Sequence, residues 1–406
     1  MKEIKGSVTS PKGFSATGFA AGVKKSGYDL ALLASEVPAV AAACFTTNVV
    51  KAASVLRNQA VLAAGGKISG VAVNSGNANA CTGEAGKQAN ADMAAALAKE
   101  LGVAPEQVLT ASTGVIGSPF PIETVAKGIA AAFPSMGTAE ENGHLAARAI
   151  MTTDTYPKEI AVELTLGGKT VTIGGMAKGS GMIHPNMATM LGFITTDCAI
   201  SKQLLQKALS ADVKETYNMV SVDGDTSTND TVLVLANGLA ENPVIETENE
   251  DYQAFCEALH HVNLFLAKNL VKDGEGATKF MEVNVTGAAT KAEAKQMAKS
   301  VVCSNLFKAA VFGEDANWGR VLCAMGYSGV SFDPEQVDIV FESAKGSILL
   351  MDCGTPIVFD EEKAAEILSE KEILIRIILR EGNETASAWG CDLSYDYVKI
   401  NGDYRS

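Results

Sequence analysis

Near the middle of its length the chain reads Ile160-Ala-Val-Glu-Leu-Thr-Leu-Gly-Gly-Lys-Thr-Val-Thr-Ile173. On both sides of the glycine pair, apolar residues recur at every second position. A period of two is typical of strands with one buried face, and adjacent glycines tolerate the backbone angles of a tight turn. The segment therefore predicts a β-hairpin.

Outward from this hairpin, patterns of helix and strand alternate, which predicts a mixed α/β protein. Thr138 and Glu141 have the spacing of a capping box, so a helix is expected to begin there and to run to about Met151. The last three expected strands are almost continuously apolar, which indicates positions in the middle of layered sheets. We expect helices at 84–101, 122–133, 138–151, 202–217 and 251–271, and strands at 231–235, 281–285, 337–341, 348–351 and 373–379.

Length and composition limit the class of protein. A chain of 406 residues exceeds the size at which one core stops growing, so two lobes are expected. The net charge of −14 comes without a basic patch, which argues against a nucleic-acid partner. The chain shows no signal peptide, and its most apolar early stretch, residues 31–45, is interrupted by Glu36 and Pro38. We therefore expect a cytoplasmic protein without a membrane span, whose eight cysteines are reduced and mostly buried.

Several familiar motifs fail on inspection. Gly168-Lys-Thr170 lacks the earlier glycine of a phosphate-binding loop and lies in the expected hairpin turn. The run from Asp223 to Asp230 resembles the start of a calcium loop, but Thr228 and Val234 replace its glycine and glutamate. The four histidines form no zinc motif, so no metal is expected. A Ser-His-Asp triad stays open, although the chain has no Gly-x-Ser-x-Gly elbow.

The hairpin ends in Lys178-Gly-Ser-Gly-Met-Ile-His-Pro-Asn-Met-Ala-Thr-Met-Leu191, where glycines and a proline interrupt both periods. If the peptide bond before Thr189 were broken, its hydroxyl would share a residue with a free α-amine. Such an amine has an ordinary pKa of about 7.7–8.0 and is a competent base near neutral pH. A threonine paired with its own N-terminal amine is a known form of activated nucleophile.

This segment resembles the self-cleavage signature of the ornithine acetyltransferase (glutamate N-acetyltransferase) family, including its Ala-Thr-Met-Leu core. Further blocks along the whole chain are similar to that family in the same order. They are Asn74-Ser-Gly-Asn-Ala-Asn-Ala-Cys-Thr-Gly83, Ser112-Thr-Gly-Val-Ile-Gly117, Thr152-Thr-Asp-Thr155, Ser221-Val-Asp-Gly-Asp-Thr-Ser-Thr-Asn-Asp230 and Asn317-Trp-Gly-Arg320.

The resemblance implies cleavage between Ala188 and Thr189. The two products are an α-chain of residues 1–188, with the oxyanion-hole loop, and a β-chain of residues 189–406 that begins with the nucleophile. They are expected to stay together, two of each. The resemblance also implies a layered α/β sandwich in two lobes, similar to the N-terminal-nucleophile hydrolases.

By the same resemblance, Thr189 takes the acetyl group of N2-acetyl-L-ornithine and passes it to L-glutamate, a step of arginine biosynthesis. Thr113 and Gly114 match the family positions that donate to the oxyanion. The positions that match substrate-binding residues are Thr153, Lys178, Thr189, Glu275, Asn401 and Ser406. A cation suits the carboxylate of an amino acid and an anion suits its amine, which favours Lys178 and Glu275.

Exchange of one amide for a similar amide requires neither ATP nor a cofactor, so none is expected. Whether acetyl-coenzyme A is a second acetyl donor stays open. Two alternatives remain: a self-processing hydrolase or aminopeptidase that uses the same threonine, and a binding protein that is never cleaved.

Overall fold

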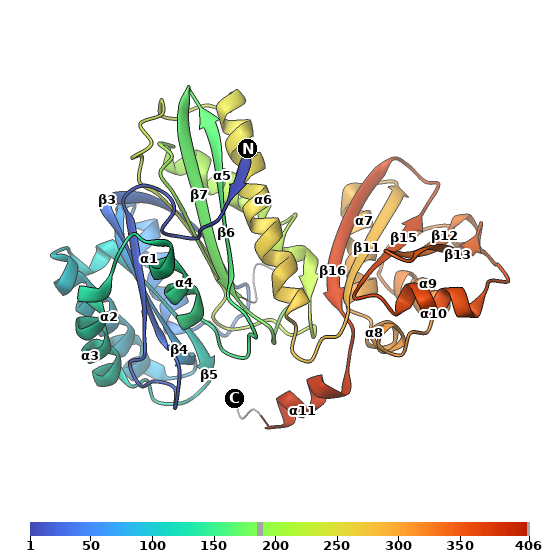
Figure 1. The fold of residues 1–406 in the computed structure, drawn as a ribbon, viewed down its shortest axis with the longest axis horizontal. Helices are drawn as coiled ribbons and strands as arrows, with labels where there is room; N and C mark the ends of the chain where they lie inside the picture. The colour runs from blue at the N-terminus through green and yellow to red at the C-terminus, as the bar shows by residue number, and fades with distance from the viewer. Residues whose placement is uncertain (185–189, 404–406) are drawn as a thin grey trace.

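The computed structural model describes residues 1–184 and 190–403, and these residues form two lobes, each built on one β-sheet (Figure 1). The first lobe holds the N-terminal half of the chain and the second holds most of the C-terminal third. The long helix α6 (Glu250–Lys272) packs on the first sheet and also contacts the second. No described helix is long and apolar enough to cross a membrane.

The first sheet has nine strands in the order β1-β6-β7-β8-β10-β3-β4-β5, with β2 paired to β3. Both of its parallel pairs, β4 with β5 and β8 with β10, are needed to build the site described below. The strands are β1 (Lys2–Ile4), β2 (Phe14–Phe19), β3 (Leu30–Phe45), β4 (Ile68–Asn77), β5 (Val108–Val115), β6 (Lys158–Leu166), β7 (Lys169–Lys178), β8 (Leu191–Thr196) and β10 (Thr231–Ala236).

Strand β3 changes partners along its length, and this divides the first lobe into layers. Its first part pairs with β2 and β4, and its second part, beyond Pro38, pairs with β10. One apolar cluster joins Leu33 of β3 and Val73 of β4 to Phe193 of β8 and Leu233 of β10. The half of the sheet that contains β4 therefore packs face to face with the half that contains β8 and β10. Helices α2 and α3 cover one outer face, and α5 and α6 cover the other. The predicted layered α/β sandwich is confirmed.

The second sheet has seven strands in the order β14-β13-β12-β15-β11-β16-β9. They are β9 (Val220–Ser221), β11 (Phe280–Ala288), β12 (Asp338–Ser343), β13 (Gly346–Asp352), β14 (Thr355–Pro356), β15 (Glu372–Ile378) and β16 (Glu384–Cys391). The remaining helices are α1 (Ala53–Ala63), α2 (Gly83–Leu101), α3 (Ile122–Ala132), α4 (Glu140–Ala149), α5 (Lys202–Asp212), α7 (Lys291–Val302), α8 (Asn305–Phe312), α9 (Trp318–Gly326), α10 (Glu361–Leu368) and α11 (Tyr395–Asp403).

Most of the expected elements are present. Strands β6 and β7 form the predicted hairpin, and Gly167 and Gly168 at its turn both have positive φ, as a two-residue turn of this type requires. The predicted capping box is wrong, because α4 begins only at Glu140 and its N-cap residue is Ala139, which makes no side-chain capping hydrogen bond. Helix α5 is also shorter than expected and ends at Asp212.

Burial corrects two further expectations. The expected strands at 337–341, 348–351 and 373–379 are not buried on both faces: in β15, Ile373, Ile375 and Ile377 are buried whereas Arg376 is exposed. Strands β8 and β10 of the first sheet, in contrast, are buried at every residue. The cysteines are all free, but five of the eight are not buried, and Cys81, Cys323 and Cys353 are exposed.

A buried cluster of charges ties the first sheet to the end of α6. The ammonium of Lys158 is fully buried and lies 2.7 Å from a carboxylate oxygen of Asp154 and 2.5 Å from one of Asp273. The same oxygen of Asp154 accepts the backbone N–H of Gly179, at 2.6 Å, and Asp273 accepts the backbone N–H of Thr155. One cation therefore joins the loop after α4, the end of β7 and the C-terminus of α6.

We predict that Lys158→Met lowers the free energy of unfolding by about 3–5 kcal/mol, because it leaves two buried carboxylates without their cation. Denaturant titration of the folded protein measures this loss. Lys87→Met is the matched control, since Lys87 pairs with Glu84 on the surface and its removal should barely move the midpoint. Equal stability of both variants would contradict the assigned role of Lys158.

Candidate functional site

One cavity is lined by residues from distant parts of the chain. Six of the site residues predicted from the sequence lie in its wall. Thr113 and Gly114 come from the end of β5, Lys178 from the end of β7, and the others from loops and the C-terminal helix. Its described lining consists of Ala78, Thr113, Gly114, Ile116, Thr152, Thr153, Lys178, Gly181, Met182, Met190, Leu191, Ser227, Thr228, Asn229, Asp230, Glu275 and Asn401. The predicted cleavage residues Ala188 and Thr189 and the predicted binding residue Ser406 lie outside the described residues.

The end of β5 is held very close to β4. Gly114 lies opposite Gly76 in the parallel pair and has a φ of 130°, which favours glycine. A Cβ atom on Gly114 would lie 2.4 Å from the carbonyl carbon of Gly76 and 2.6 Å from the nitrogen of Asn77. No side chain fits in this space, so a glycine is required for Thr113 and Gly114 to reach the cavity in this conformation.

Lys178 is the last residue of β7, and its ammonium is buried in the cavity wall. The side-chain nitrogen lies 3.4 Å from the hydroxyl oxygen of Thr113. Burial lowers the pKa of Lys178, while Asp154 opposes that shift. Burial alone would raise the pKa of Asp154, but Lys178 and Lys158 outweigh it and bring this pKa to about 2. The cavity therefore contains a buried amine with an ionised carboxylate behind it.

Glu275 approaches the cavity from the turn that follows α6. Its backbone N–H donates to the carbonyl of Ser180 at 2.8 Å, and the amide nitrogen of Asn401 donates to its carboxylate at 2.7 Å. A Cβ atom on Gly181 would lie 2.3 Å from the Glu275 carboxyl group. A glycine at 181 thus lets this carboxylate lie against the segment that leads to the predicted cleavage point.

Thr153 and Met182 mark two other sides of the cavity. The hydroxyl of Thr153 lies 2.6 Å from the hydroxyl of Ser180, so the loop after α4 contacts the segment after β7. The backbone N–H groups of Met182 and Ile183 donate to the carboxylate of Asp223, at 2.6 and 2.9 Å. Asp223, the first residue of the run that resembles a calcium loop, therefore anchors the start of the signature segment.

Among the residues of the cavity wall that sequence reasoning did not select, Asn229 and Asp230 are polar and buried. The side-chain amide of Asn229 donates to the carbonyls of Ala78 and Ser112, at 2.6 and 2.8 Å, and so fixes the loop before β10 to the end of β5. Asp230, the next residue, is 2% exposed, and burial raises its pKa well above the ordinary range. Its signal in the sequence is its place at the end of the largely polar run from Asp223 to Asp230, directly before strand β10.

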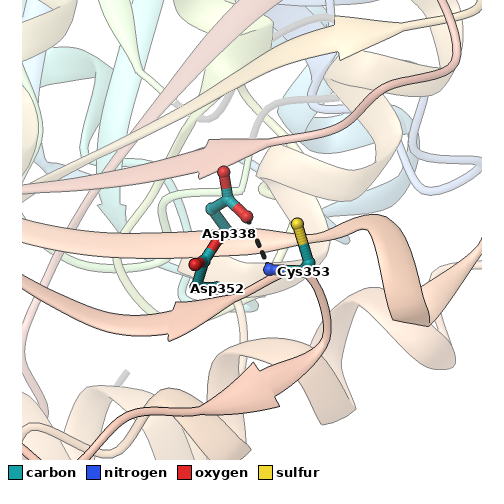
Figure 2. A group of neighbouring side chains, drawn as sticks. All are labelled: Asp338, Asp352 and Cys353. Atoms are coloured by element: carbon teal, nitrogen blue, oxygen red, sulfur yellow. Dashed lines mark hydrogen bonds between the residues drawn. The ribbon is translucent and has the colours of Figure 1, made fainter.

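A second cluster of polar groups lies far along the second sheet (Figure 2). Asp338, Asp352 and Cys353 place three potential ligand atoms within 4.8 Å of one another. The Asp338 carboxylate is already occupied, because it accepts the backbone N–H of Cys353 at 2.8 Å and pairs with Arg380 at 2.8 Å. These interactions are typical of a structural ion pair at a strand end.

The described wall of the cavity thus contains groups that can bind an amino acid and stabilise a negative charge. A buried cation and a partly exposed carboxylate can bind the two charged groups of an amino acid. A backbone turn held in one conformation by close packing can aim N–H groups at a developing negative charge. Met182 and Met190, which lie on either side of the predicted cleavage point in the sequence, both line the cavity.

Comparisons with known proteins agree along the whole chain. A model of the ArgJ family matches residues 15–406. The arginine biosynthesis bifunctional proteins ArgJ of Symbiobacterium thermophilum and Caldanaerobacter subterraneus subsp. tengcongensis are 54% and 52% identical, with 100% of both chains covered in each case. A solved structure of the arginine biosynthesis bifunctional protein argJ from Bacillus halodurans is 49% identical, with a TM-score of 0.51, over 53% of this chain and 100% of that chain. The chain therefore belongs to the ArgJ family.

Proposed function

We propose that this protein transfers the acetyl group of N2-acetyl-L-ornithine to L-glutamate through an acetyl ester on Thr189. The products are L-ornithine and N-acetyl-L-glutamate, and the reaction serves arginine biosynthesis. The observation that carries the proposal is the single cavity that brings together Thr113, Gly114, Lys178 and Glu275 from distant parts of the chain. The names of the curated relatives support the pathway.

In this mechanism the amino-acid substrate binds by its charged groups, Lys178 to the carboxylate and Glu275 to an amine. Thr153, Asn401 and Ser406 complete the binding site. The Thr189 hydroxyl attacks the acetyl carbonyl, and Thr113 and Gly114 stabilise the oxyanion that forms. Ornithine leaves, glutamate enters, and its amine takes the acetyl group from the ester.

The nucleophile is created by cleavage between Ala188 and Thr189, which leaves chains of residues 1–188 and 189–406. Because β8 pairs with β7 and β10 pairs with β3, the first lobe combines strands from both sides of this point, and the two chains stay together. The half-length match to the solved Bacillus halodurans chain fits a family member present as two chains. We propose two copies of each chain in the assembly.

The exchange of one amide for a similar one needs no energy source, so we propose that the reaction uses no metal and no cofactor. The word bifunctional in the names of the relatives supports acetyl-coenzyme A as a second acetyl donor to glutamate. We place the reaction in the cytoplasm. If the enzyme were instead a hydrolase that uses the same threonine, acetate release to water would exceed transfer to glutamate.

Thr189→Ala tests the proposed nucleophile. We expect this variant to remain one chain of 42.2 kDa on a denaturing gel and to transfer no acetyl group, because it has neither the attacking hydroxyl nor a competent N-terminus. The wild-type protein should give two bands, one with an N-terminus that begins Thr-Met-Leu-Gly. Two bands from the variant, or transfer by an uncut wild-type chain, would contradict the proposal.

Gly114→Ala tests the proposed oxyanion site. The added methyl group must displace the turn from Gly76, and a displacement of this kind should lower kcat/KM for transfer by about 10²-fold. Gly117→Ala is the control, because Gly117 also has a positive φ but a Cβ there meets no atom within 4 Å. We expect the control to be slightly less stable and to keep its transfer rate. Similar rates for both variants would remove Gly114 from the site.

A further inference from the structure

The charges in the described wall of the cavity match one proposed substrate better than the other. Among the described lining residues, Lys178 is the one basic side chain, and Asp230 and Glu275 are acidic. N2-acetyl-L-ornithine carries one carboxylate and one ammonium, so Lys178 and Glu275 can pair with both. L-Glutamate carries two carboxylates, and Glu275 would repel the second. Binding of glutamate therefore requires another cation beside the cavity.

Lys24, in the loop between β2 and β3, places a cation beside this wall. Its ammonium donates to the carbonyl of Met151 at 3.0 Å, and Met151 directly precedes Thr152 and Thr153 of the cavity lining. The side chain of Lys24 is partly exposed. Met151 is the one hydrogen-bond partner of this ammonium among the described residues, and an ammonium has three N–H groups. It can therefore bind a carboxylate and keep its bond to Met151.

The backbone of this loop is fixed by one buried carboxylate. Asp29 is fully buried, and its carboxylate accepts the backbone N–H groups of three loop residues. They are Ala21, Gly22 and Lys24, at 2.6, 3.0 and 2.9 Å. The carbonyl of Asp29 also accepts the backbone N–H of Ser75 in β4, at 2.9 Å. The loop is thereby attached to the end of β4.

Close packing then directs the Lys24 side chain across that strand end. A Cβ atom on Gly76 would lie 2.7 Å from the Cγ atom of Lys24, so the lysine stem lies against the backbone at Gly76. The opposite neighbour of Gly76 is Gly114, in the wall of the cavity. The hydroxyl of Ser75 donates to the carbonyl of Ala149 at 2.7 Å, which holds the loop after α4 at the same strand end. The ammonium of Lys24 thus reaches that loop from a fixed base.

The acidic groups that act on Lys24 already have other partners. Burial lowers the pKa of Lys24, whereas Asp29 and Asp154 oppose this shift and Lys178 adds to it. Asp29 binds the three backbone N–H groups of the loop, and Asp154 is paired with Lys158 at 2.7 Å. A carboxylate bound to this ammonium would favour its charged form. The position is therefore suited to an anionic group of a substrate.

We propose that Lys24 determines the acceptor specificity of the cavity: its ammonium binds the side-chain carboxylate of L-glutamate while Lys178 binds the other carboxylate. This inference rests on the proposed function. In this arrangement the same cavity binds, in turn, a side chain that ends in an ammonium, paired with Glu275, and a side chain that ends in a carboxylate, paired with Lys24. No bond to Lys24 forms or breaks during the transfer.

Lys24→Met tests this role, because methionine keeps an unbranched side chain and removes the charge. We expect the KM for L-glutamate to rise by about 10- to 100-fold, as the loss of a charged hydrogen bond does. L-Glutamine has the same shape without the second charge, so its kcat/KM as an acceptor should change by less than about 3-fold. Lys24→Arg keeps the charge and should keep the preference for glutamate over glutamine.

The donor half of the reaction shows whether the loss is specific. Exchange of the acetyl group between N2-acetyl-L-ornithine and labelled L-ornithine needs no glutamate, and it should keep its wild-type rate in Lys24→Met. Lys25→Met is the matched control, because Lys25 is the next residue and is exposed, and it should change neither activity. An unchanged KM for glutamate in Lys24→Met would overturn the inference. Equal losses with glutamate, with glutamine and in the exchange would also overturn it, because they indicate a structural role only.

If Lys24→Met does not fold, Lys24→Gln decides the question, because glutamine keeps a hydrogen-bond donor for the carbonyl of Met151 and is uncharged. The same changes are expected. The wild-type protein gives an independent test: its kcat/KM for glutamate should exceed that for glutamine by at least about 10-fold, and equal values would overturn the inference. Failure of the proposed function is distinguishable, because the wild-type protein would then catalyse neither the exchange nor the transfer to glutamate.

Discussion

The geometry of the cavity depends on two buried ion pairs, in which the ammonium of Lys158 contacts the carboxylates of Asp154 and Asp273. Its two carboxylate partners bind backbone N–H groups of the segments that carry the site: Asp154 binds Gly179, next to Lys178, and Asp273 lies two residues before Glu275. Because a buried cation must be paired, these segments cannot separate without a large loss of stability. The ion cluster thereby fixes the distance between the cavity's cation and its carboxylate.

Close backbone packing supplies the second constraint. Parallel pairing aligns the ends of β4 and β5, and it also aligns the starts of β8 and β10. Asn229 then joins these two places through its bonds to the carbonyls of Ala78 and Ser112. The end of β5, with Thr113 and Gly114, and the start of β8, next to Met190, are therefore positioned by one connected set of strands and one amide side chain. Cleavage at residue 189 would leave this set intact, because its hydrogen bonds are made by residues on either side.

The sequence predicted what depends on neighbours along the chain. The hairpin of β6 and β7 follows from its alternation and its glycine pair, and α2 and α6 follow from their periodicity. What depends on distant contacts was not predictable: the change of partners along β3, the exposed face of β15, and the ion cluster of Lys158. The prediction of a capping box was wrong because the spacing of two residues does not determine where α4 begins. Contacts with the rest of the fold also determine its first residue.

For the site, family resemblance selected residues that the fold gathers in one cavity, whereas composition and spacing alone gave no reason to choose them. Asp230 was missed because its burial in the cavity wall, where one carboxyl oxygen has no hydrogen-bond partner among the described residues, is visible only in three dimensions. A buried carboxylate at the start of a strand looks the same in sequence as any polar residue at a loop end. The strand register, which places it beside Met190, is likewise a long-range property.

The central claim is that Thr189 carries the acetyl group on a newly made N-terminal residue. It is tested most directly by mass spectrometry of the protein after incubation with N2-acetyl-L-ornithine alone and rapid acid quenching. The account predicts one acetyl group on the hydroxyl of a fragment that begins at Thr189, and its loss when L-glutamate is added before the quench. An active protein that carries the acetyl group on another residue, or that transfers it while remaining a single unbroken chain, would contradict the account.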